Sequence, residues 1–316
     1  MVHFFKHTKI NFIGQRKYAY MLSIGIIVAG IISIIAHHGL NWSIDFVGGT
    51  VIQLKFQKPV ENDRSKISEI VSTLGYGTPE VKTVGSPDGG EIQIVVKKTA
   101  KTSEVGDEIE KAITAKFPGN PFVEQKRDLV GPKIGGELRY NAFLAVGLAF
   151  IMICLYIGIR FNLPFGMAAV IALVHDIMIT ISIFSFVNAE FSLPVIAALL
   201  TIIGYSINDT IVVFDRVREN LHNLKGHKSF EDLFNESYNL TLGRTVNTSL
   251  ATFLAIVTTF IFFFNSGDVL KLFSGAMCIG IITGTFSSLY VAGALVVEWN
   301  NKWPIDPKVV MGTKKR

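Results

Sequence analysis

The chain has 316 residues, 49% of them hydrophobic, and a mean hydropathy of +0.42. A chain with these values is too apolar to be an ordinary soluble domain of this size. A helix that crosses the hydrocarbon core of a bilayer needs about 20 mainly apolar residues. The sequence contains six such runs: Tyr18–Ala36, Tyr140–Ile159, Leu163–Val187, Leu193–Phe214, Thr245–Phe264 and Leu270–Trp299. A soluble protein is therefore excluded, and a polytopic α-helical membrane protein with six transmembrane helices is predicted.

The net charge of +5 reflects membrane topology rather than nucleic-acid binding. Lys and Arg are enriched in the short cytoplasmic flanks of membrane spans. Segments 1–17, 160, 215–244 and 300–316 together contain 15 of these residues, whereas the loops 188–192 and 265–269 contain none. We therefore expect the arm 1–17, the stretch 215–244 and the tail 300–316 to be cytoplasmic. Segment 37–139 lies between the first span (18–36) and the bundle of the five later spans (140–299), and it is expected on the outer side.

The outer segment 37–139 has the pattern of a small α+β domain. Apolar and polar residues alternate in its strands, and apolar residues recur at helical spacing in its helices. The predicted elements are a strand at Val51–Phe56, a helix around Ile67–Leu74, strands at Glu80–Val84 and Glu91–Val96 joined by a turn at 86–90, a helix at about Ser103–Phe117 and a strand at about Phe122–Leu129. This order, βαββαβ, predicts a ferredoxin-like domain.

Paired glycines lie at both junctions between this domain and the membrane spans. Gly48 and Gly49 precede its first strand, and Gly131, Gly135 and Gly136 follow its last. Glycine adopts backbone conformations that other residues cannot reach. The glycines indicate either a hinge between domain and membrane or a pair of tight turns.

The five later spans form two tight outer hairpins, separated by the cytoplasmic stretch 215–244. That stretch is expected to continue span Leu193–Phe214 as a helix and then to form an amphipathic piece at Phe230–Leu240. In the last span, small residues recur at every fourth position: Ala276, Gly280, Gly284, Ser288 and Ala292. Such a ridge lets helices approach closely. It fits packing within the chain or a seam between subunits.

Asp209, preceded by Asn208, lies inside span Leu193–Phe214, and Arg244 lies at the mouth of the next span. A charged side chain at the bilayer centre costs about 2.5–3.5 kcal/mol on insertion scales, so such residues are usually paired or functional. Both residues lie near the inner surface, which makes an Asp209–Arg244 salt bridge plausible. Thr248, one turn beyond Arg244, is placed to bond the carboxylate. The alternatives are a static polar brace and ordinary polar contacts between helices.

His175 and Asp176 lie in the middle of span Leu163–Val187. Neighbouring residues point about 100° apart on a helix, so at most one of them is expected to line a common path. A proton relay or a polar clasp is predicted, with plain hydrogen bonding between helices as the alternative.

The sequence carries no sign of an enzyme. It lacks a GxxxxGK[ST] phosphate-binding loop, an HExxH motif and any metal-ligand set. Cys154 and Cys278 both lie in spans without CxxC spacing, so neither a disulfide nor a metal site is predicted. No cofactor is expected, and energy from ATP would have to come from another chain.

Several motifs together resemble the SecF family of bacterial protein-export proteins, which belongs to the RND transporter superfamily. They are FVGGT at 46–50, VGPKIGGEL at 130–138, His175-Asp176, GYSINDTIVVFDRVREN at 204–220 and GRTVNTSLATF at 243–253. The resemblance covers about residues 10–300. It implies an accessory subunit in the bacterial cytoplasmic (inner) membrane that uses the proton gradient to help exported polypeptides leave the Sec translocon channel on the outer side.

The same resemblance ties Asp209 and Arg244 to proton conduction. A full unit of the superfamily has twelve spans, so the six found here imply a six-span partner resembling SecD. Sodium is an alternative coupling ion, because Asn208 and Thr248 offer oxygen ligands beside the carboxylate. Two other functions remain open: a small-molecule efflux half-transporter of the RND type and a non-transporting membrane scaffold.

Overall fold

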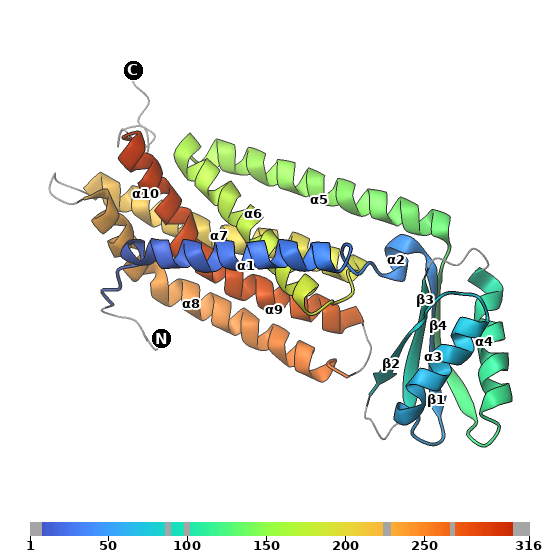
Figure 1. Cartoon of the computed structure of the whole chain (residues 1–316). Helices are drawn as coiled ribbons and strands as arrows, with labels where there is room; N and C mark the ends of the chain where they lie inside the picture. The colour runs from blue at the N-terminus through green and yellow to red at the C-terminus, as the bar shows by residue number, and fades with distance from the viewer. Residues whose placement is uncertain (1–7, 86–89, 98–101, 224–228, 266–268, 306–316) are drawn as a thin grey trace.

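A computed structural model describes residues 8–85, 90–97, 102–223, 229–265 and 269–305 (Figure 1). Within these residues six helices are long and apolar enough to cross a membrane, which confirms the predicted number of spans. The predicted turn at 86–90 lies outside the described residues except for Gly90. Parts of the predicted cytoplasmic segments, at 1–7, 224–228 and 306–316, also lie outside them.

The helices of the bundle are α1 (Arg16–Ala36), preceded by the short η1 (Ile13–Gln15), α5 (Pro132–Arg160), α6 (Leu163–Phe186), α7 (Leu193–Asn223), α8 (Phe230–Phe262) and α9 (Val269–Ser287), which continues through the π-helical η4 (Ser288–Ala292) into α10 (Gly293–Lys302). The start of α1 and the end of α10 lie at the end of the bundle farthest from a separate sheet domain (Figure 1). Both described ends of the chain therefore lie on the same side of the bundle.

Two helices, α5 and α8, are longer than the sequence predicts. Helix α5 begins at Pro132 rather than Tyr140, because proline fits the first turn of a helix. Helix α8 begins at Phe230, where Ser229 and Asp232 form a capping box, so the expected amphipathic piece and the fifth span are one helix. Helix α7 runs on to Asn223, which confirms the expected helical continuation of the span Leu193–Phe214. Helices thus extend well beyond the apolar runs by which they were recognised.

The sheet domain contains α2 (Ile44–Val47), β1 (Gly49–Phe56), η2 (Glu61–Asp63), α3 (Arg64–Thr73), β2 (Glu80–Val84), β3 (Glu91–Lys97), α4 (Thr102–Lys116) and β4 (Phe122–Val130). Its strands form one antiparallel sheet in the order β2-β3-β1-β4. Helices α3 and α4 cover one face of this sheet (Figure 1). This arrangement confirms the predicted ferredoxin-like domain.

The core of the domain follows the alternation read from the sequence. Ile52, Leu54, Ile92 and Ile94 point from the two central strands toward the helices and are fully buried. The helices contribute their apolar stripes to the same core: Ile67, Val71, Val105, Ile109 and Ile113. Each fully buried aliphatic side chain of this size stabilises a fold by about 1.5–3 kcal/mol.

Helix α9 lies at the centre of the bundle and packs against α6, α7 and α8. The small residues of its ridge make this possible. A Cβ on Gly280 would collide with Ile202 of α7, and one on Gly284 would lie 3.0 Å from the Cβ of Ser206. The part of the ridge formed by Gly280 and Gly284 therefore packs within the chain.

The two glycine motifs contact each other where the sheet domain meets α5. Gly48 has a positive φ of 74°, and a Cβ on it would lie 2.8 Å from the Cα of Pro132. A Cβ on Gly135 would lie 2.9 Å from the backbone nitrogen of Gly48, whereas Gly131 and Gly136 have open space at this position. Gly49 packs against Val96 of β3. The motifs thus form a close-packed joint, and hinge motion at it stays a prediction.

Gly135→Ala is expected to destabilise this joint, because the added methyl group has no room. Overpacking of this kind typically costs about 1–3 kcal/mol. Gly136→Ala is the matched control: it adds the same methyl group one residue later in open space, where alanine favours the helix by about 1 kcal/mol. The apparent melting temperature of the purified protein in detergent should fall for the first variant only. Equal effects of the two substitutions would contradict the close packing.

Candidate functional site

Asp209 is buried inside the bundle. It lies on α7 with 3% of its surface exposed. The hydroxyl of Ser249, on α8, donates to Asp209 Oδ2 over 3.2 Å, and the hydroxyl of Thr285, on α9, donates to Ser249 Oγ over 2.8 Å. Three helices therefore meet at this carboxylate through a short chain of hydroxyl groups.

Arg244 does not form the expected salt bridge. Among the described residues, no ion pair joins it to Asp209, and the side chain of Arg244 is exposed on α8. It lines a cavity of about 640 Å³ together with Asn208, Asp215, Arg216 and Glu219. The predicted ion pair is therefore not formed in this structure, because Arg244 lines a cavity at the surface while Asp209 is buried, although the guanidinium still acts on the carboxylate electrostatically.

Thr248 and Asn208 also lie away from the carboxylate. The Thr248 hydroxyl donates to the carbonyls of Arg244 and Thr245 in its own helix, over 3.0 and 2.9 Å. Thr248 shares the exposed face of Arg244, and the next residue, Ser249, points to Asp209 instead. Asn208 is exposed and lines the cavity. The oxygen ligands expected from these two side chains do not surround Asp209.

His175 and Asp176 contact each other, which corrects the expectation that they point apart. His175 Nδ1 lies 2.9 Å from Asp176 Oδ1, and its Nε2 lies 2.8 Å from the hydroxyl of Ser23 in α1. Asp176 is fully buried, and its Oδ2 accepts from Ser206 of α7 over 2.5 Å and from Ser287 of α9 over 2.8 Å. Two adjacent residues of α6 therefore take part in one polar cluster.

The hydroxyl residues in the hydrogen-bond networks around the two carboxylates were not predicted. They are Ser23, Ser206, Ser249, Thr285 and Ser287. Many hydroxyl residues in the spans bond only a carbonyl of their own helix, and the sequence does not distinguish the two kinds. The one available signal was Ser206, which stands three residues before Asp209 in the motif GYSIND.

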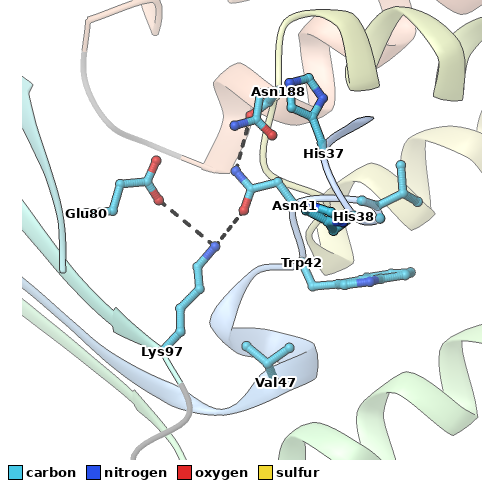
Figure 2. Close-up of a pocket in the computed structure, with 10 residues that line it drawn as sticks. His37, His38, Asn41, Trp42, Val47, Glu80, Lys97 and Asn188 are labelled. Carbon is cyan, nitrogen blue, oxygen red and sulfur yellow. Dashed lines mark hydrogen bonds and ion pairs between the residues drawn. The ribbon is translucent and has the colours of Figure 1, made fainter. Parts of the chain in front are cut away.

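A second polar region joins the sheet domain to the end of the bundle beside it (Figure 2). Lys97 of β3 donates to Asn41 Oδ1 over 2.7 Å, and Asn41 Nδ2 donates to the carbonyl of Asn188 over 3.1 Å. These residues border a cavity of about 480 Å³, which is also lined by His37 and Glu80. The loop between α6 and α7 is thus held by the sheet domain.

Asp45 of the first glycine motif links the same domain to the helix that carries Asp209. Its Oδ2 accepts a hydrogen bond from the backbone nitrogen of Leu193, the first residue of α7, over 3.0 Å. A carboxylate at this position accepts a hydrogen bond from an N–H group that has no partner within the helix, and its negative charge interacts favourably with the positive end of the helix dipole. The outer end of α7 is therefore fixed by a residue beside Gly48.

Within the described residues, no group of three or more His, Cys, Asp or Glu side chains is placed to hold a metal ion.

The sequence of the chain matches that of known protein-export membrane proteins. Residues 109–302 match the family model described as "Protein export membrane protein SecD/SecF, C-terminal", and residues 33–60 match the "SecD/SecF GG Motif". The chain belongs to the SecD/SecF family of protein-export membrane proteins. It is 40% identical to the protein translocase subunit SecF of Calditerrivibrio nitroreducens, an alignment that covers 92% of this chain and 93% of the relative.

The chain also resembles the protein translocase subunit SecDF of Thermus thermophilus. The two sequences are 39% identical over 93% of this chain and 39% of SecDF. The crystal structure of that SecDF superposes with a TM-score of 0.80 at 36% identity, again over 93% of this chain and 39% of the other. The family thus places the chain in protein export as a multi-pass membrane protein, and it spans well under half of the longer relative.

Glu190 provides a pH test of the outer contact. It lies in the loop between α6 and α7, 3.7 Å from Lys97 and 3.9 Å from Lys82. Burial raises the pKa of Glu190 above its ordinary value of 4.5, and the two lysines oppose this shift. Because the folded protein binds this proton more readily than the unfolded chain, the contribution of Glu190 to stability is lost as the pH rises through its raised pKa.

Glu190→Gln removes this titration. The apparent melting temperature of the variant, measured against wild type, should therefore rise as the pH increases from about 4.5 to 7. Glu61→Gln serves as the control, because this side chain is exposed on η2. A difference between Glu190→Gln and wild type that does not change with pH would contradict the assignment.

Proposed function

We propose that the chain is the SecF-type subunit of a complex that uses the proton motive force to promote late steps of polypeptide export across the bacterial cytoplasmic membrane. The single observation that carries this proposal is Asp209, a carboxylate buried among membrane helices with one hydroxyl donor from another helix and no ion pair in the described part of the chain. Such a group is costly in hydrocarbon unless it has a function. Taking up a proton removes its charge.

The free energy that one proton releases on crossing the membrane is large enough to drive a conformational change. A potential of about 100 mV supplies about 2.3 kcal/mol per charge. A difference of one pH unit adds about 1.4 kcal/mol. The sum, about 3.7 kcal/mol per proton, is enough to bias a two-state helix bundle several hundred-fold. Sodium is the rival coupling ion, but Asn208 and Thr248 lie away from Asp209, which weakens the argument for it.

A conformational change at Asp209 has a route to the outer domain. Asp209 lies on α7, and Asp45 holds the outer end of that helix. Asp45 is three residues from Gly48, which packs against Gly135 and Pro132 at the start of α5. We propose that movement of α7 reaches the sheet domain through these contacts and tilts it. The tilt would pull or release an exported polypeptide.

The remaining parts of the proposal concern partners and orientation. A SecD-like partner with six spans is supported by SecDF of Thermus thermophilus, of which this chain matches 39% of the length. The cavity beside Arg244 opens at the surface of this chain, where such a partner would cover it. Contact with the Sec translocon channel rests on family resemblance. The distribution of Lys and Arg supports cytoplasmic termini.

Two other functions fit less well. A small-molecule efflux half-transporter needs a largely apolar pocket in its outer part, whereas His37, His38, Asn41, Glu80 and Lys97 help line the cavity there. A non-transporting scaffold does not require a titratable carboxylate inside the membrane, and it is distinguished by the experiment below.

Asp209→Asn keeps the size of the side chain and abolishes its titration. The variant should assemble with its partner, yet export stimulated by a proton gradient should fall to the rate measured without a gradient. Glu236→Gln is the control: Glu236 is an exposed carboxylate on α8 and is not among the residues that line the cavity beside Arg244. Late export of a radiolabelled precursor into vesicles measures both variants. Full gradient-driven export by Asp209→Asn would overturn the proposal.

A further inference from the structure

Asp176 joins four helices through one carboxylate. It lies on α6, accepts from Ser206 of α7 and Ser287 of α9 at the same oxygen, and bonds His175, which reaches Ser23 of α1. All hydrogen-bonding groups of this cluster are at least nine-tenths buried. A carboxylate that accepts three hydrogen bonds in a low-dielectric interior fixes its donors firmly, since losing one leaves a buried charge under-solvated.

The donors of Asp176 lie directly beside those of Asp209. On α7, Ser206 stands one turn before Asp209. On α9, Ser287 stands two residues after Thr285, whose hydroxyl donates to Ser249, the donor to Asp209. One residue before Thr285, Gly284 packs against Ser206 and brings α9 close to α7. Asp176 thus bonds α7 and α9 together, and the hydrogen bonds that lead to Asp209 depend on the relative position of the same two helices.

The π-helical η4 (Ser288–Ala292) begins immediately after Ser287. A π-helix has a wider turn than an α-helix and is frequent at functional sites. Its first residue, Ser288, lies 2.9 Å from Thr210 of α7 through the two hydroxyl oxygens. The Asp176 cluster therefore bonds α7 and α9 together one residue before the π-helical turn, where the regular α-helical geometry of α9 ends.

We propose that Asp176 is a positioning residue for Asp209. It holds α7 against α9 in the register at which the hydroxyls of Thr285 and Ser249 meet the Asp209 carboxylate. The inference rests on the proposed function in one respect only, that Asp209 is the group whose proton drives export. Its geometric part, that Asp176 sets the hydrogen bond of Asp209, is tested separately.

The test uses the purified complex in lipid vesicles. The infrared carboxyl band of protonated Asp209 is identified by its loss in Asp209→Asn, and its frequency reports the hydrogen bond from Ser249. Asp176→Asn and Ser287→Ala should both move this band to higher frequency, and both should reduce gradient-stimulated export about tenfold, the factor expected for losing one hydrogen bond to a charged group. Ser287→Ala tests the inference independently if Asp176→Asn does not fold.

Ser185→Ala is the matched control, because the buried Ser185 also donates to a hydroxyl of another helix, that of the half-buried Ser33 in α1, over 2.9 Å. It should leave the band and the export rate unchanged. An unmoved band or normal export in Ser287→Ala would overturn the inference, as would an equal effect of Ser185→Ala. Normal export by Asp209→Asn would instead overturn the proposed function, whatever the band shows.

Discussion

The interaction on which this structure depends is the hydrogen bonding of carboxylates inside the membrane. A charged side chain there costs several kcal/mol unless other groups solvate it. Asp176 receives donors from three residues on three helices, so it is held in one arrangement. Asp209 receives one hydroxyl donor from a neighbouring helix, which leaves it freer to change its protonation and its contacts. The two acidic groups therefore suit different roles, one as an anchor and one as the group that responds to protons.

This division connects the membrane interior with the outer domain. Helix α7 contributes to both carboxylate sites and is held at its outer end by Asp45. The glycines beside Asp45 let the sheet domain and α5 approach so closely that no side chain fits between them. A close-packed joint transmits displacement better than a loose linker, because packed interfaces resist continuous deformation. Beside the C-terminal part of α7, exposed Arg244 and its cavity form a surface that suits a membrane partner.

Much of the fold was predictable from the sequence because its signals are local. The apolar runs gave the six spans, and the alternation at Val51–Phe56 and the helical spacing around Ile67 gave the ferredoxin-like domain. Asp209 and His175-Asp176 stood out because ionisable residues are rare in spans. Their hydrogen-bond partners did not stand out, because Ser249 and Ser287 lie on helices distant in the sequence and hydroxyl residues are common in the spans. The expected Asp209–Arg244 pair failed because sequence gives the depth of a side chain but not the face on which it lies.

The central claim is that protons, acting at Asp209, drive the contribution of this chain to export. It is tested most directly by imposing one gradient at a time on vesicles that contain the chain, its SecD-like partner and the translocon. A proton gradient without a sodium gradient should raise the yield of fully exported polypeptide, and a sodium gradient alone should not. Stimulation by sodium alone, or no stimulation by protons, would contradict the account.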